Sequence, residues 1–182
     1  MANLVYRRRF TVEWGHCDPA GIVFNSHFFE FFDWSVWLLF ETALGVPPNE
    51  LGTAFGIVGI PLVDAKARFL KPAKFNDVAD IRSEVSEFRR SSFDVAHRIS
   101  IGGELAVEGS ETRVWAGRDP DDPVKLKGMA IPAAVIARCR ATAERLSCSK
   151  FPIAGLAERV PLAACPRVED ASIDEHKSLV GL

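Results

Sequence analysis

The most apolar segment of the chain has the spacing of a helix. From residue 25 to residue 44, aromatic and aliphatic side chains recur at every turn, and Gly45 with the Pro47–Pro48 pair ends the pattern. A side-chain oxygen of Asn25 or Ser26 can cap the first turn. Because the segment is apolar around nearly its whole circumference, we expect other elements to enclose it on most sides.

Before and after this helix the apolar spacing changes to a period of two, which predicts strands. Residues 4–13 are rich in β-branched and aromatic side chains and predict a first strand. The later strands are long and are predicted at Ile57–Leu70, Val78–Phe88, Phe93–Ile101 and Leu105–Ala116. Gly102 and Gly103 can supply the positive φ angles of a tight hairpin, so the last two strands should be antiparallel neighbours.

Together these elements predict an α+β domain in which a curved antiparallel sheet wraps around the apolar helix. Residues 133–146 predict a second, amphipathic helix that covers an edge or an end of the sheet. We assign residues 1–146 to this one domain. Residues 147–182 contain three prolines and no sustained periodicity, so they predict an irregular C-terminal tail.

Composition and charge then narrow the function. The 182 residues are 48% hydrophobic and 25% charged, which is ordinary for a soluble globular domain. With 22 Lys and Arg against 24 Asp and Glu, the net charge is -2, so the chain has no overall basic field for nucleic acid or an anionic membrane. The arginines at 7–9 precede polar residues rather than the apolar core of a signal peptide. The spacing of the four cysteines is typical of reduced thiols, and we expect a cytoplasmic protein.

The loop before the apolar helix carries the leading candidate for chemistry. Asp18 lies between Gly15 and Gly21, just ahead of the helix start, where free backbone amides and the helix dipole favour negative charge. Asp18 could attack a carbonyl, or activate water to attack it, while the amide of Asn25 holds the developing oxyanion. The alternative is a turn aspartate that only accepts backbone hydrogen bonds. Cys17 is more typical of a half-buried thiol than of a nucleophile, since consecutive loop side chains diverge.

Two further groups of residues could contact a ligand. Asp33 lies among aromatic residues of the helix and needs a partner, either a polar substituent of a substrate or an internal group such as an arginine. Arg89, Arg90 and Ser91 place two guanidinium groups and a hydroxyl at a strand boundary, a combination that suits phosphate. The alternative for this second group is an ordinary solvated turn. Lys71 is a weaker candidate of the same kind.

The segment from Val12 to Asn25, VEWGHCDPAGIVFN, resembles the active-site segment of the 4-hydroxybenzoyl-CoA thioesterase family, which belongs to the hot-dog fold superfamily. The resemblance continues through residues 56–61, Phe69 and residues 87–93, in the same order and at similar spacing. It covers roughly residues 5–140, and such collinearity is more specific than any single motif.

The resemblance implies a long antiparallel sheet around a central helix and hydrolysis of an acyl- or aroyl-CoA thioester. By residue-to-residue match, Asp18 is the catalytic nucleophile or general base, and the backbone amide of Asn25 polarises the thioester carbonyl. The matched substrate-binding residues are Asp33 and Ile60 at the acyl end, and Arg89, Arg90 and Ser91 at the phosphates of coenzyme A. An isoleucine at position 60, where the hydroxybenzoyl enzymes have a polar residue, favours a less polar acyl group.

We therefore expect a cytoplasmic thioesterase that cleaves an aromatic or medium acyl-CoA without a metal or an organic cofactor. The resemblance also implies a homodimer or homotetramer with active sites at the subunit boundary. Two alternatives remain open. One is a hot-dog hydratase acting on an unsaturated acyl thioester, although no Asp-x4-His motif follows Asp18. The other is a domain that binds acyl-CoA without catalysis.

Overall fold

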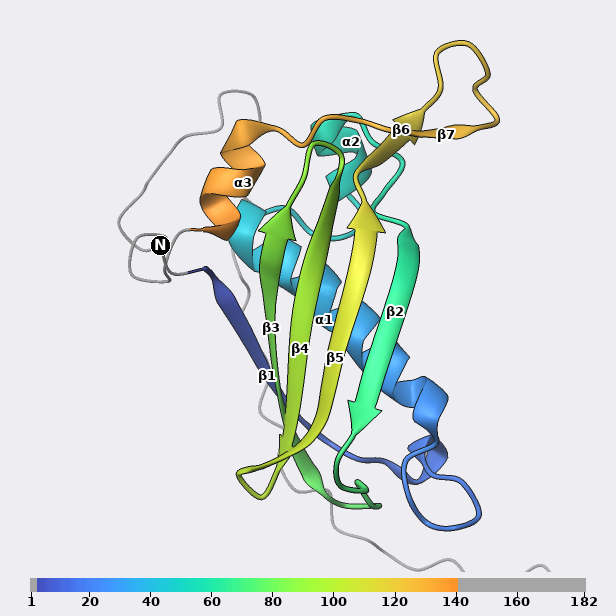
Figure 1. The fold of residues 1–182 in the computed structure, drawn as a ribbon, viewed down its shortest axis with the longest axis vertical. Coiled ribbons are helices and arrows are strands. Elements are labelled where there is room, and N and C mark those ends of the chain that lie inside the picture. Colours follow the sequence, from blue (N-terminus) through green and yellow to red (C-terminus); the bar gives the residue numbers. More distant parts are fainter. Residues whose placement is uncertain (1–2, 141–182) are drawn as a thin grey trace, which may run out of the picture. The chain divides into compact units, whose positions relative to one another are not determined.

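The computed structural model describes residues 3–140, which form a five-stranded antiparallel sheet with one long helix across its inner face (Figure 1). The helix is α1 (Asn25–Leu44). The strand order is β1 (Val5–Thr11), β3 (Val78–Phe88), β4 (Ser92–Ile101), β5 (Glu104–Val114) and β2 (Leu62–Phe69). The predicted α+β class, with a long antiparallel sheet around a central helix, is confirmed. The predicted tail, residues 147–182, lies outside the described residues.

The β4–β5 hairpin forms as its glycines predict. Gly102 and Gly103 have φ angles of 58° and 86°, the left-handed region that a two-residue hairpin turn requires. Past β5 the chain continues into a small two-stranded sheet of β6 (Ala116–Arg118) and β7 (Leu126–Gly128). It then enters α3 (Ala133–Cys139), which contacts α1, and residues 141–146 of the predicted second helix lie outside the described part.

The prediction of one strand over residues 57–70 is wrong in its first half. Only Leu62–Phe69 is a strand, and it follows a short helix, α2 (Leu51–Phe55), which Gly56 ends in the left-handed conformation with φ 65°. Between them Gly59 makes an isolated bridge to Ala116. The segment 57–61 therefore makes tertiary contacts with the chain beyond β5 instead of continuing the strand. Alternation of apolar residues along the sequence cannot distinguish these two cases.

Helix α1 has the predicted length but a different start. Phe24 occupies the N-cap position without a side-chain cap, and Asn25 is already the first helical residue, so the predicted capping by Asn25 or Ser26 is wrong. Gly45 ends the helix with φ 70°, as predicted. One face of α1 is buried on the sheet, whereas Trp34 on the opposite face is 50% exposed, so the single chain encloses the helix on one side only.

Helix α1 and the sheet are in close contact at Gly109 of β5. A Cβ atom added there would lie 2.4 Å from the ring of Phe32, a residue of α1 that is fully buried. The same ring stacks on His97 of β4, with 4.5 Å between ring centroids. The helix can therefore settle to this depth only over a residue without a side chain.

We expect Gly109→Ala to destabilise the fold by about 1–3 kcal/mol, because the added methyl must displace a packed aromatic ring. Chemical denaturation followed by circular dichroism measures the loss. Gly15→Ala is the matched control, since nothing lies within 4 Å of a Cβ there, and its effect should stay within about 0.5 kcal/mol. Equal stability of the two variants would contradict the packing assigned to Phe32.

Candidate active site

A cavity of about 460 Å³ opens at the start of α1. The start of α1 and the end of β2 lie at the same end of the sheet (Figure 1). The lining of the cavity comes from Asp18, residues 22–25, Phe28 and residues 69–73. Phe28 and Phe69 form a tilted aromatic pair with 5.3 Å between centroids. The volume of the cavity and its apolar walls are typical of a binding site for a small organic group, and few polar groups line it.

The loop that carries Asp18 is closed by backbone hydrogen bonds. The amide of Asp18 donates to Ile22, and the amide of Gly21 donates back to Asp18, both at 2.9 Å. Gly21 adopts φ 76°, which allows so tight a turn. The amide of Val23 donates to the carbonyl of Ala73 at 2.8 Å and so ties the loop to the opposite wall of the cavity.

The Asp18 side chain serves the turn and the cavity together. Its Oδ1 accepts a 2.8 Å hydrogen bond from the amide of Ala20. Its Oδ2 receives no hydrogen bond from residues 3–140, and the residue lines the cavity. One oxygen thus orients the carboxylate while the other stays available as nucleophile or base. The turn hydrogen bonds expected of Asp18 are present, and the geometry leaves the functional interpretation open as a proposal.

Asn25 brings a free amide to the same cavity. As the first residue of α1, its N–H has no partner within the helix, and no acceptor among residues 3–140 takes it. The positive end of the helix dipole adds to its attraction for a developing oxyanion. The structure therefore brings together the two residues that the sequence predicts as catalytic.

The other candidate nucleophiles and bases are either held by backbone contacts or buried. Cys17 is half-buried, as predicted, and its Sγ lies 3.8 Å from the carbonyl of Glu13. The Nδ1 atom of His16 accepts a hydrogen bond from the Glu13 amide at 3.0 Å. Burial raises the pKa of the Cys139 thiol to about 12, so that side chain is not a nucleophile near neutral pH.

Asp33 and Ile60 do not line this cavity, but one side chain joins them. Arg113 of β5 donates from Nη2 to Oδ1 of Asp33 at 2.6 Å, and from Nη1 to the carbonyl of Ile60 at 3.3 Å. The Asp33 side chain is half exposed, whereas the Ile60 side chain is buried in the core. The pairing with an arginine is one of the two partners that the sequence allows for Asp33.

A buried polar chain continues behind Arg113. Nε of Arg113 donates to Oε2 of Glu111 at 2.9 Å, and that oxygen lies 3.7 Å from Nε2 of His97, which is too far for a hydrogen bond. His97 contacts Ser83 through Nδ1 at 2.7 Å. Burial lowers the pKa of His97. Burial by itself raises the pKa of Glu111, but the bound Arg113 guanidinium leaves that pKa below its ordinary value. His97 is therefore neutral near pH 7.

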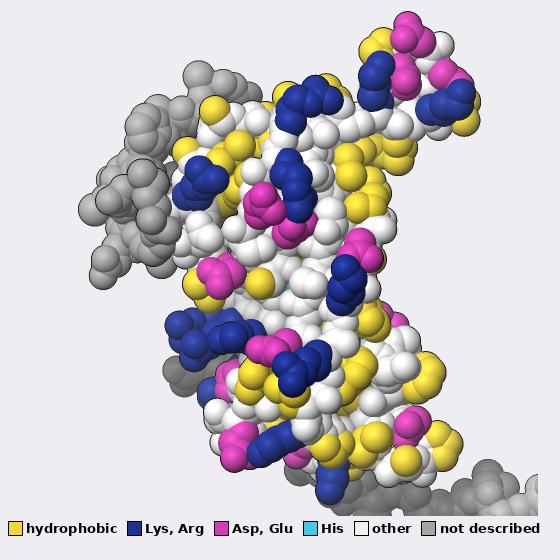
Figure 2. Space-filling view, viewed as in Figure 1, with side chains coloured by type: hydrophobic (Ala, Val, Ile, Leu, Met, Phe, Trp, Pro, Cys, Tyr) yellow, Lys and Arg dark blue, Asp and Glu magenta, His cyan; other side chains and the backbone are white. Residues whose placement is uncertain are grey.

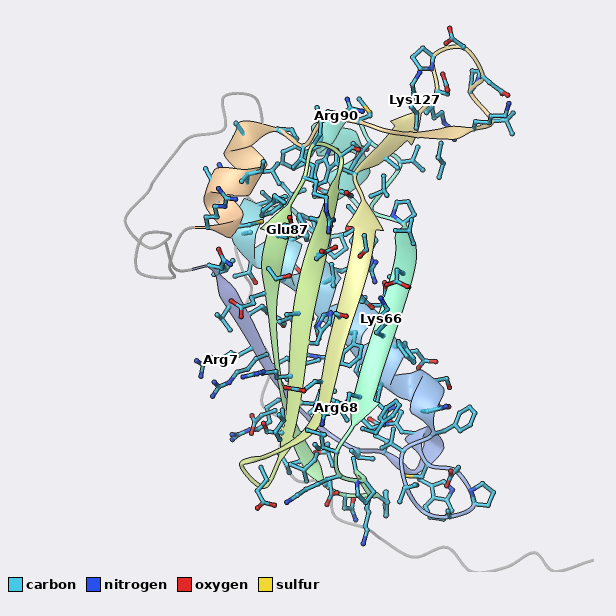
Figure 3. All side chains as sticks on the ribbon, in the orientation of Figure 1. Arg7, Lys66, Arg68, Glu87, Arg90 and Lys127 are labelled. Carbon is cyan, nitrogen blue, oxygen red and sulfur yellow. The ribbon has the colours of Figure 1, made fainter. Side chains whose placement is uncertain are left out.

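The predicted phosphate-binding residues lie at the opposite end of the sheet from Asp18, in the β3–β4 hairpin (Figures 1 and 3). The Arg89 guanidinium is bonded to Asp94 and Glu87, and its bond to Asp94 lowers the pKa of that carboxyl. Arg90 is exposed, and no acidic side chain among residues 3–140 pairs with its guanidinium. Ser91 is half-buried and accepts the amide of Trp115 at its carbonyl.

Sequence reasoning missed part of the cavity wall. Phe24, Phe28 and Leu70 line it beside Asp18, and Phe24 and Leu70 are 51% and 42% exposed. Large apolar residues directly after the Asp18 loop and directly after a strand are the signal in the sequence that could have found Phe24 and Leu70. Lys71, the weaker cation, lines the same cavity and forms an ion pair with Glu104.

Comparison with known proteins identifies the family to which this chain belongs. A profile of the thioesterase-like superfamily matches residues 12–138, which is more than two thirds of the chain. The chain belongs to the thioesterase-like superfamily. Among curated relatives, 4-hydroxybenzoyl-CoA thioesterase of Pseudomonas sp. (strain CBS-3) is 34% identical over 134 residues, covering 70% of this chain and 92% of that protein. The resemblance predicted from the sequence is confirmed.

Solved structures of thioesterases agree with this assignment. The Pseudomonas sp. (strain CBS-3) 4-hydroxybenzoyl-CoA thioesterase superposes with a TM-score of 0.68 at 31% identity, over 76% of this chain and all of that one. A gentisyl-coenzyme A thioesterase superposes with a TM-score of 0.61 at 30% identity, over 74% of this chain and 98% of that one. The thioesterase-like chain therefore has the hot-dog fold. In residues 3–140 no helix is long and apolar enough to cross a membrane.

Proposed function

We propose that the protein hydrolyses an aromatic acyl-CoA thioester to the free acid and coenzyme A. The observation that carries the proposal is the cavity shared by the Asp18 carboxylate and the open amide of Asn25. The named relatives are thioesterases of 4-hydroxybenzoyl-CoA and gentisyl-coenzyme A, both aromatic thioesters. The aromatic walls formed by Phe28 and Phe69 suit a ring of this kind.

In the proposed mechanism the thioester carbonyl oxygen accepts the Asn25 amide, which stabilises negative charge as the carbonyl carbon becomes tetrahedral. In the nucleophilic route the free oxygen of Asp18 attacks that carbon, the C–S bond breaks, and water later hydrolyses the anhydride. In the base route Asp18 takes a proton from the attacking water and gives it to the departing thiolate as the C–S bond breaks. In the nucleophilic route the thiolate takes its proton from the water that hydrolyses the anhydride. Both routes release one acid and one thiol, and neither requires a metal or an organic cofactor.

The remaining site residues are proposed to come from a second copy of the chain, in a homodimer or homotetramer. In one chain Asp33 and Ile60 lie apart from the cavity, and residues 89–91 lie at the far end of the sheet. Strand β2 is an open edge on which Val63 is 60% exposed, and hydrophobic side chains reach the surface along that side (Figure 2). Exposed charges lie in the middle of β2, but exposed apolar side chains at both ends of this unpaired edge strand favour association.

We assign catalysis to residues 1–146 and place the protein in the cytoplasm, where an acyl-CoA substrate and reduced thiols occur together. Cys17 and Cys139, the cysteines within the described residues, are both free thiols, which supports a reducing compartment.

Asp18→Asn should lower kcat by at least about a hundredfold while KM changes little, because the amide keeps the turn but is neither nucleophile nor base. Release of free thiol from hydroxybenzoyl-CoA measures both constants. Cys17→Ser is the matched control in the same loop and should retain turnover. Full activity in the Asp18→Asn variant would remove that carboxylate from the mechanism.

Arg90→Ala should raise KM about tenfold with kcat retained, because its unpaired guanidinium is free to bind a phosphate of coenzyme A. Arg89→Ala should raise KM less, since that guanidinium already serves Asp94 and Glu87. The decisive comparison uses the same acyl group on pantetheine, which lacks the nucleotide phosphates. The Arg90 effect should vanish there, and its persistence would assign Arg90 a different role.

Val63→Asp should convert the oligomer into monomers and abolish thioester hydrolysis, because a charge on the exposed β2 edge opposes association. Light scattering after gel filtration gives the mass, and thiol release gives the activity. Val124→Asp is the control, since Val124 is 89% exposed beyond the main sheet. A fully active Val63→Asp monomer would contradict a shared site.

A further inference from the structure

Arg113 connects Asp33 and Ile60, the two residues that the resemblance to the thioesterase family matches to the acyl end of the substrate. Its guanidinium reaches Asp33 on α1 and the carbonyl of Ile60, in the segment between α2 and β2. These two residues lie far apart along the chain, and the buried arginine is the group that both contact. Only 2% of the Arg113 side chain is exposed, so a ligand would meet Asp33 rather than the arginine.

Stability does not explain this arrangement. Arg113 and Glu111 are both buried, and the structure leaves Oε1 of Glu111 and Nε2 of His97 without a hydrogen-bond partner among residues 3–140. Apolar residues of similar volume would fill such a space without the cost of dehydrating charges. Because some polar atoms around this buried ion pair lack hydrogen-bond partners, we look for a functional role of the pair rather than a contribution to stability.

The directions of the hydrogen bonds around Arg113 indicate its role. Glu111 holds Arg113 from behind through Nε and Nη2, and the Ile60 carbonyl holds Nη1, so the planar guanidinium is fixed in direction. The remaining contact is outward, to Oδ1 of Asp33. The Oδ2 atom of Asp33 receives no donor from residues 3–140, and half of the side chain is exposed.

We propose that Arg113 is a positioning residue that aims the free oxygen of Asp33 at the acyl group of the substrate. This inference rests on the proposed function, because it assumes that Asp33 meets the acyl end. A carboxylate held in this way accepts hydrogen bonds and offers none. It therefore discriminates between an aromatic ring with a hydroxyl donor and the same ring without one, and Arg113 sets how sharply it does so.

The test is a double-mutant cycle read on two substrates, hydroxybenzoyl-CoA and benzoyl-CoA. The preference is the ratio of their kcat/KM values. Arg113→Met should reduce the wild-type preference about tenfold, the size expected for one misdirected charged hydrogen bond. Asp33→Ala should remove the same preference, and adding Arg113→Met to Asp33→Ala should change it no further.

Controls separate positioning from general damage. Arg113→Lys retains the positive charge and should restore part of the preference, and it serves in place of the methionine variant if that one does not fold. Arg98→Met removes an arginine that is 68% exposed on the outer face of the sheet and should leave the preference unchanged. Thermal unfolding and light scattering of every variant establish that it is folded and assembled.

Three results would overturn the proposal. The first is an unchanged substrate preference in a folded Arg113→Met or Arg113→Lys variant. The second is a loss of preference from Arg113→Met that is as large in the Asp33→Ala background as in the wild type, and the third is a wild-type enzyme without any preference. Absence of thiol release from both thioesters by the wild type would instead contradict the proposed hydrolysis. In that case the same cycle is read on the affinities for non-hydrolysable thioether analogues of the two substrates, where the expected ratios and the overturning results are the same.

Discussion

The packing of Phe32 against Gly109 is the constraint on which the rest of the molecule depends. It sets the depth at which α1 lies on the sheet, because any side chain at position 109 would meet the ring. That depth fixes where the first turn of α1 emerges, next to the end of β2, and so determines the cavity between them. The position of the Asn25 amide, which the proposed mechanism uses, thus follows from a glycine on a distant strand.

In the loop before α1, a structural role and the proposed catalytic role fall to one side chain. Asp18 closes its turn with one oxygen and leaves the other to the cavity. The turn bonds also prevent the carboxylate from rotating away from the helix start. A side chain held in this manner loses little further freedom when a substrate binds, which is a condition for effective catalysis in the proposed reaction.

The sequence predicts best what local rules determine. The bounds of β3, the end of α1 at Gly45 and the glycine hairpin follow from alternation and backbone conformation. The partner of Asp33 does not, because Arg113 lies 80 residues further along the chain and only the fold brings the two side chains together. With Glu111 and Arg113 on the inner side, polar residues occupy a face that a pattern argument would fill with apolar ones.

The open face of α1 links the buried polar chain to the proposed assembly. Beside the exposed Trp34, Asp33 is a half-exposed carboxylate on the open face of α1. If a second subunit covers that surface, Asp33 loses water, and an unpaired carboxylate there would oppose association. The guanidinium of Arg113 offsets that cost from within the sheet, so the same ion pair would serve subunit contact and substrate recognition. The two roles differ in one respect, because association needs only the neutralising charge, whereas recognition also needs its direction.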